Sequence, residues 1–194
     1  MSKRIALLSA VAFSALALTS TIVTPVGAQE KTVMVGGAAM FPSKNIIQNA
    51  VNSKDHTTLV AAVKAAGLVE TLEGKGPFTV FAPTNTAFGK LPAGTVDNLV
   101  RPENKGALTK ILTYHVVPGK LEASGLTDGR TLKTVEGEQL TVKKSDGKIW
   151  IVDAKGGTGM VTISNVNQSN GSFNVCPAVP ADGGVPDAST ALAR

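Results

Sequence analysis

The sequence predicts an α+β fold organised as a single domain. Its first half carries apolar residues at helical spacing, whereas its second half is a series of short β-prone segments separated by turn residues. The chain has 194 residues, of which 43% are hydrophobic and 17% charged, so a packed core is expected. Because only 4% of the residues are aromatic, that core must consist mainly of Val, Leu, Ile and Ala.

Residues 1–28 have the pattern of a secretory signal peptide. Lys3 and Arg4 precede an apolar run, and Val26-Gly27-Ala28 has the small-x-small pattern of a cleavage site. The alternative is a membrane anchor, but Ser and Thr interrupt the run, and a spanning helix needs about 18 uninterrupted apolar residues. We therefore expect cleavage after Ala28, a secreted or periplasmic protein, and no transmembrane anchor in the mature chain.

The first half of the mature chain is predicted to be mainly helical. Residues 29–42 lack periodicity and are expected to form a flexible leader. A helix is predicted over 45–51, followed by a second one that begins at Asp55 as N-cap and ends at Gly67 as a left-handed C-cap. The apolar positions of this second helix lie 3–4 residues apart: Leu59, Ala62, Val63 and Ala66. A short continuation over 68–72 is expected to end at the following glycines.

A buried strand is predicted next, over residues 78–82, where large apolar and small residues alternate. Pro83 is expected to stop it, and Thr84 to cap a short helix that runs to Phe88. Further helices are predicted over 95–100 and from Pro102 onward, because proline is tolerated in a first helical turn.

The second half is predicted to be a strand meander. Its first strand covers 114–117 and ends at a Pro-Gly turn. Further strands are expected over the ranges 131–135, 139–143, 148–152 and 161–166. Glu136-Gly137 and Asp146-Gly147 mark hairpin turns. The folded domain is expected to span 43–177, and the Ala-, Pro- and Gly-rich residues 178–194 are expected to form a disordered tail.

The composition offers little material for catalysis, metal binding or nucleic-acid binding. One cysteine forms neither an internal disulfide nor a zinc–thiolate cage. His56 is interpreted as an exposed first-turn residue, and His115 as a core-edge histidine with hydrogen-bonded ring nitrogens rather than a catalytic base. Removal of the signal peptide takes away two of 19 basic residues and leaves the 14 acidic ones, so the mature net charge is +3. This charge is too weak for the basic face of a nucleic-acid binder.

Three segments together resemble a known family. They are TVFAPTNTAF at 79–88, LTYHVVPGKL at 112–121 and ISNVNQSNG at 163–171. In this order and at these separations they are similar to the signatures of the fasciclin (FAS1) domain family. The resemblance covers roughly 43–175, and the leader is similar to that of small secreted bacterial members. After residue 171 the chain departs from the family, because Asn174 and Pro177 stand where histidine and aspartate are usual. Since proline removes a ladder donor, the last strand should end or bulge there.

The resemblance implies a FAS1-like wedge in which β-sandwich-like sheets have several helices packed at one side. It also implies a non-catalytic role without a cofactor, as a secreted module for cell adhesion or matrix attachment whose partner is a cell-surface or matrix protein or glycan. The family's Tyr-His motif is linked to adhesion, so the resemblance marks an interaction segment: Tyr114, His115, Val116, Val117 and Leu121. The same residues have a structural interpretation, as stabilisers of the domain.

A second function from a different class stays open at this point. An apolar pocket between the helices and the sheet would make the protein a periplasmic or secreted binding module for a small lipid or metabolite.

Overall fold

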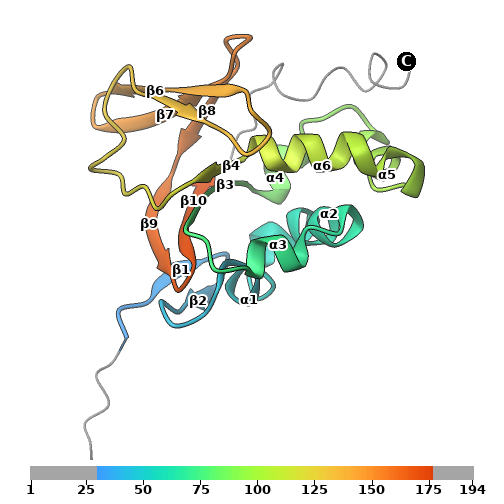
Figure 1. Ribbon diagram of the computed structural model, residues 1–194, viewed down its shortest axis with the longest axis horizontal. Helices are drawn as coiled ribbons and strands as arrows, with labels where there is room; N and C mark the ends of the chain where they lie inside the picture. Colours follow the sequence, from blue (N-terminus) through green and yellow to red (C-terminus); the bar gives the residue numbers. More distant parts are fainter. Residues whose placement is uncertain (1–29, 177–194) are drawn as a thin grey trace, which may run out of the picture.

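The computed structural model describes residues 30–176 and confirms the α+β fold (Figure 1). The helices are α1 Ile46–Ala50, α2 Thr57–Ala66, α3 Val69–Glu73, α4 Asn85–Phe88, α5 Thr95–Leu99 and α6 Lys105–Tyr114, with 3-10 turns η1 Lys54–His56 and η2 Pro102–Asn104. The strands are β1 Val33–Val35, β2 Ala38–Met40, β3 Phe78–Pro83, β4 Val116–Pro118, β5 Thr131–Lys133, β6 Gln139–Ser145, β7 Lys148–Val152, β8 Thr158–Val161, β9 Ile163–Gln168 and β10 Gly171–Cys176. The predicted signal peptide and the predicted tail lie outside the described residues.

The strands form a small hairpin and two four-stranded sheets. The central sheet has the order β4-β3-β10-β9, and the second sheet has the order β5-β6-β7-β8. All neighbouring pairs are antiparallel except β3 and β10, which run parallel from Phe78↔Gly171 to Pro83↔Cys176. In Figure 1 the helices gather on one side of the central sheet and the second sheet lies on the other.

Two hydrophobic clusters result from this layering. Neighbouring residues of a strand point to opposite faces, so Val80 packs into the cluster that includes the helices, whereas Phe81 packs into the cluster that includes the second sheet. On β10, Phe173 belongs to the first cluster and Cys176 to the second. The central sheet is therefore buried on both faces, and the segment that joins α6 to β4 crosses between the two clusters.

The structure differs from the expected flexible leader over residues 29–42. Strands β1 and β2 pair as a hairpin from Val33↔Met40 to Val35↔Ala38. Gly36 and Gly37 both have positive φ, at 56° and 77°, which suits a two-residue hairpin turn. Val35 and Met40 are each 1% exposed and belong to the first cluster. Burial of these two side chains holds the hairpin against the domain.

Several predicted helix boundaries also differ. The N-cap of α2 is His56, and Asp55 lies inside the 3-10 turn before it, whereas Gly67 takes the predicted left-handed conformation with φ 72°. Thr84 occupies the N-cap of α4, but its side chain makes no capping hydrogen bond. Residues 114 and 115 end a helix instead of starting a strand, because Tyr114 closes α6 and the His115 amide donates to the Leu112 carbonyl.

The predicted strand over 161–166 is in fact two strands in different sheets, β8 and β9, which separate at Thr162. Despite the departure from the family pattern near Asn174, β10 continues to Cys176: all six residues of this strand are buried, and it occupies the interior of the central sheet. Its pairing with β9 shifts register between Phe173 and Val175, as in a β-bulge. The Asn174 side chain accepts a hydrogen bond from the Asn165 amide at 3.3 Å. Pro177 lies outside the described residues.

Candidate functional site

The predicted interaction segment is mostly buried. Tyr114, Val116 and Val117 are 4–5% exposed, and His115 and Leu121 are partly buried. Val116 packs into the first hydrophobic cluster, whereas Tyr114, Val117 and Leu121 meet in the second. These five side chains therefore do not form one free surface.

His115 is held by the end of α6. Its Nδ1 donates to the Ile111 carbonyl at 2.8 Å, as expected for a core-edge histidine, and its ring meets that of Tyr114 edge to face at 6.0 Å between centroids. Burial lowers the pKa of His115 below 6.5, although the bond to Ile111 opposes the shift. The ring is therefore neutral at physiological pH, and its bonded nitrogen ties down the helix end.

An apolar cavity lies on the helical side of the central sheet. Its volume is about 50 Å³, and its walls come from α1, α2, α3, α6, β3, β4 and β10. Leu59, Val63, Leu72 and Phe173 are among its buried lining residues, and His115 lines it from the end of α6.

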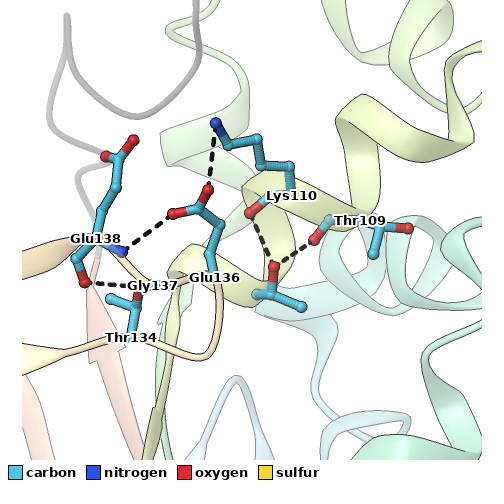
Figure 2. Close-up of polar contacts among 7 residues, drawn as sticks. Thr109, Lys110, Thr134, Glu136, Gly137 and Glu138 are labelled. Carbon is cyan, nitrogen blue, oxygen red and sulfur yellow. Dashed lines mark hydrogen bonds and ion pairs between the residues drawn. The ribbon is translucent and has the colours of Figure 1, made fainter.

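A polar hollow of about 250 Å³ lies where the end of α6 meets two loops. Tyr114 and Lys110 of α6 line it, together with three carboxylates: Glu136 and Glu138 from the β5–β6 turn and Asp153 from the end of β7. Ala154 and Lys155 complete the lining. Figure 2 shows Lys110 and the residues of the β5–β6 turn facing each other across this region.

The charged groups of the hollow differ in how many ion-pair and hydrogen-bond partners they have. The Lys110 Nζ pairs with the Glu136 Oε1 at 3.2 Å, and the Glu136 Oε2 accepts the Glu138 amide at 3.2 Å (Figure 2). The Asp153 Oδ1 accepts the amides of Lys155 at 2.8 Å and Gly157 at 2.9 Å. Asp153 is only 6% exposed, yet within residues 30–176 its Oδ2 has no hydrogen-bond partner.

Tyr114 remains a neutral phenol in this setting. Burial raises its pKa to about 12, a backbone hydrogen bond with Ala154 opposes the shift, and the nearby Asp153, Glu138 and Glu136 add to it. The hydroxyl therefore offers a hydrogen-bonding group at any physiological pH and does not act as a base.

Sequence reasoning missed the carboxylates of this hollow. Glu136 was assigned only to a hairpin turn, and Glu138 and Asp153 were given no role. They are far apart in the sequence from Tyr114, and the hydrogen bond from the Val135 amide to the Val116 carbonyl, at 2.8 Å, brings the turn against β4. No local pattern predicts this long-range contact.

The interpretation of His56 as exposed is wrong. This side chain is 0% exposed, its Nδ1 lies 2.9 Å from the Ser53 Oγ, and its ring meets Phe173 edge to face at 5.1 Å. Burial lowers the pKa of His56, and the charge of Asp55 opposes the shift. His56 is therefore a core residue that packs against Phe173 of the first cluster.

No group of three or more His, Cys, Asp or Glu side chains within residues 30–176 is arranged to hold a metal ion. Across the same residues, no helix combines the length and apolar character needed to cross a membrane.

Comparison with known proteins places these features in context. The family model described as "Fasciclin domain" matches residues 54–176. Protein sll1483 of Synechocystis sp. is 44% identical over 176 residues, which cover 91% of this chain and 94% of that protein. Cell surface glycolipoprotein MPB83 of Mycobacterium bovis is 42% identical over 113 residues, which cover 56% of this chain and 48% of that protein.

A solved structure of a FAS1 domain pair from the insect cell adhesion molecule Fasciclin I is similar in fold. Its TM-score is 0.63 at 16% sequence identity, and the match covers 71% of this chain and 51% of that chain. At this identity the likeness concerns the fold alone.

Proposed function

The chain belongs to the Fasciclin domain family, and from this membership we propose that it is a secreted, non-catalytic module that binds a protein or glycan at a cell surface or matrix. The membership confirms the resemblance drawn from the three sequence segments. The proposal accords with the predicted signal peptide. It also accords with the names of two similar proteins. One is called a cell surface glycolipoprotein, and the other, which is similar in fold, is called an insect cell adhesion molecule.

The observation that carries the proposal is the polar hollow beside Tyr114. It places a buried carboxylate oxygen without a partner next to the segment that the resemblance links to adhesion. Buried polar atoms in folded proteins usually have a partner. Several buried side-chain atoms of residues 30–176 lack one, and among them the Asp153 Oδ2 is the one whose residue lines the hollow. A binding partner that supplies the missing donor would account for this oxygen.

The structure also changes the role of the Tyr-His pair in this proposal. Tyr114 is buried and lines the hollow, whereas His115 does not line it and fixes the end of α6. The groups that a partner reaches first are the exposed ones on the rim, Glu138, Ala154 and Lys155.

A cell-attachment assay tests the proposal. The purified full chain is coated on a surface, cells of the producing organism are added, and retained cells are counted after washing. We expect more cells than on an inert protein, and we expect the excess to disappear when the coating is unfolded beforehand. Protease treatment of the cells distinguishes a protein partner from a glycan, whose removal requires glycosidases.

Leu126→Ala tests whether a loss of stability alone, without a change in the hollow, lowers cell attachment. Leu126 is 0% exposed and packs in the same cluster as Tyr114, but it does not line the hollow. If this variant remains folded, it should retain cells as well as the unmodified chain does. Equal retention on the protein and on the inert coating would refute the proposal.

A second function, carriage of a small apolar molecule, is favoured by the cavity between the helices and the central sheet. Its volume of about 50 Å³ is a fraction of the roughly 150 Å³ of an engineered cavity that binds benzene, so a lipid chain would enter only if the helices separated. Extraction and mass spectrometry of protein purified from its host provide the test. A stoichiometric apolar compound supports carriage, and its absence counts against it.

A further inference from the structure

We propose that the polar hollow beside Tyr114 binds a cationic side chain, the ammonium of a lysine or the guanidinium of an arginine, presented by a protein partner. This inference rests on the proposed function and names the chemistry of the partner. Four observations carry it: an unpaired buried oxygen, a local cation already in use, an exposed carboxylate on the rim, and walls that fit an alkyl stem.

The unpaired oxygen is the Oδ2 of Asp153. The other oxygen of this carboxylate is fixed by the amides of Lys155 and Gly157, so the loop sets the orientation of the whole group. An ionised carboxylate is an acceptor on both oxygens, and a buried acceptor without a donor carries a desolvation cost. The arrangement therefore lacks a hydrogen-bond donor, and a donor with positive charge satisfies it best.

The hollow's own lysines do not supply that donor. Lys110 is paired with Glu136 at 3.2 Å. Lys155 donates through its backbone amide to the Asp153 Oδ1, and no ion pair joins its ammonium to any carboxylate of the described residues. With Glu136 paired to Lys110, the acids of the hollow without an ion pair among residues 30–176 are Asp153, whose Oδ2 is buried in the wall, and Glu138, which is exposed. Lys155 also lines the hollow, so a cationic ligand must displace its ammonium or bind beside it.

Glu138 extends the acidic character to the rim. Its side chain is exposed, and among residues 30–176 its carboxylate has neither an ion pair nor a hydrogen bond. Figure 2 shows this carboxylate without a contact to the other residues drawn, while the Glu138 backbone holds the turn through Thr134 at 2.9 Å. It is free to meet a cation that enters the hollow.

The size and the walls favour a side chain over a larger ligand. The volume of about 250 Å³ lies below the roughly 300–1,000 Å³ of pockets for drug-sized molecules. Tyr114 and Ala154 offer apolar surface along which the methylene stem of Lys or Arg packs while its charged end meets the carboxylates.

The test is a titration of the isotope-labelled full chain, followed by NMR. The cationic probes are N-acetyl-lysine amide and N-acetyl-arginine amide, and N-acetyl-norleucine amide is the neutral probe with a similar stem. We expect saturable shifts of the Glu138, Ala154, Lys155 and Gly157 amide signals with both cationic probes and none with norleucine. Equal shifts with all three probes, or no saturable shift with a cationic one, would overturn the inference.

Two variants assign the binding to the acids. Asp153→Asn keeps an Oδ1 for the two loop amides and removes the charge and the unpaired acceptor, and Glu138→Gln removes a charge from an exposed side chain. Each should weaken lysine-probe binding about tenfold or more, since a hydrogen bond to a charged group is lost. Asp128→Asn is the control, because Asp128 also accepts a backbone amide, that of Lys144 in β6 at 2.7 Å, but does not line the hollow.

Because Glu138 is exposed, its variant keeps the test decisive if Asp153→Asn does not fold. Unchanged binding by a folded acid variant, or equal weakening by Asp128→Asn, would contradict the assignment. The titration needs no cells, so its failure is separate from a failure of the attachment assay. Saturable probe binding without cell attachment would refute the adhesion role and leave the cation site in place.

Discussion

Replacement of Asn170 by alanine should remove the polar connection between the helices and the central sheet. Asn170 is 6% exposed and lies in the turn between β9 and β10. Its Oδ1 accepts the Ile46 amide at 3.0 Å, and its Nδ2 donates to the Leu72 carbonyl at 2.7 Å and the Gly74 carbonyl at 2.9 Å. One side chain thus joins the start of α1, the end of α3 and the β9–β10 turn.

The cost follows from these three bonds. At about 1 kcal/mol of net stability for each, their loss lowers the free energy of unfolding by about 3 kcal/mol. The Ile46 amide would lose its acceptor, and because Ile46 is only 2% exposed, water does not readily take the place of the Asn170 oxygen. With a urea m-value of about 2 kcal/mol/M, the midpoint should fall by about 1.5 M.

Urea unfolding followed by Trp150 fluorescence measures this change. Trp150 is the one tryptophan of the chain and lies on β7 in the second sheet. Coincidence of its fluorescence transition with that of the far-UV circular dichroism would show that the domain unfolds as one unit. Asn52→Ala is the control, since Asn52 is exposed and makes one bond, to the Gln48 carbonyl at 2.8 Å. It should cost less than about 0.5 kcal/mol. An Asn170→Ala loss as small as that of the control would refute the reasoning.

Three further predictions concern the buried interior. Burial lowers the pKa of His56 and His115 in the folded protein below 6.5. As the pH falls below 6.5, the unfolded chain therefore binds protons that the folded chain does not, and the free energy of unfolding decreases until the pH reaches the lowered pKa values. Urea unfolding across this range should show a slope of at most about 1.4 kcal/mol per pH unit for each histidine, and His56→Gln should reduce it. Burial raises the pKa of Cys176 to about 12, so the native thiol should resist iodoacetamide and react once urea unfolds the chain; rapid alkylation of the native protein would contradict this. A Cβ at Gly171 would overlap the Phe78 carbonyl across the parallel β3–β10 pair, so Gly171→Ala should destabilise by about 3 kcal/mol, and an unchanged Tm would be inconsistent with that pairing.

Local sequence patterns predicted the elements whose conformation depends mainly on residues close in the sequence. In α2 the apolar positions at 3–4 spacing are all buried, and Gly67 takes the left-handed conformation that ends the helix. The hairpin of β1 and β2 had a local signal too, since Val33, Val35 and Met40 surround a Gly36-Gly37 turn. The segment was nevertheless predicted to be flexible because it lacks periodicity, and its short strands gain their stability from burial against the domain.

The remaining features depend on contacts between distant parts of the chain. His56 is buried because Phe173 of β10 packs against its ring, and nothing near residue 56 indicates this. The hollow beside Tyr114 exists because the β5–β6 turn and the end of β7 approach the end of α6. Of the acids that line it, only Glu136 was singled out from the sequence, as a turn residue, since local sequence patterns do not show which turns meet.

The burial of Tyr114 also bears on how its variants are interpreted. Because this side chain belongs to the second hydrophobic cluster, a large truncation there removes packing as well as a wall of the hollow. A loss of attachment by such a variant does not distinguish the two effects. Variants of Glu138 and Asp153 distinguish lost packing from a changed hollow. Glu138 is exposed, and Asp153→Asn changes the charge with little change in volume.

The most direct test of the account is cell attachment by Asp153→Asn beside Asp128→Asn and the unmodified chain, with all three shown to be folded. The account predicts that Asp128→Asn retains cells as the unmodified chain does, whereas Asp153→Asn loses most of the attachment because the hollow no longer holds a partner's cation. Full attachment by folded Asp153→Asn would contradict the claim that this hollow is where the module binds.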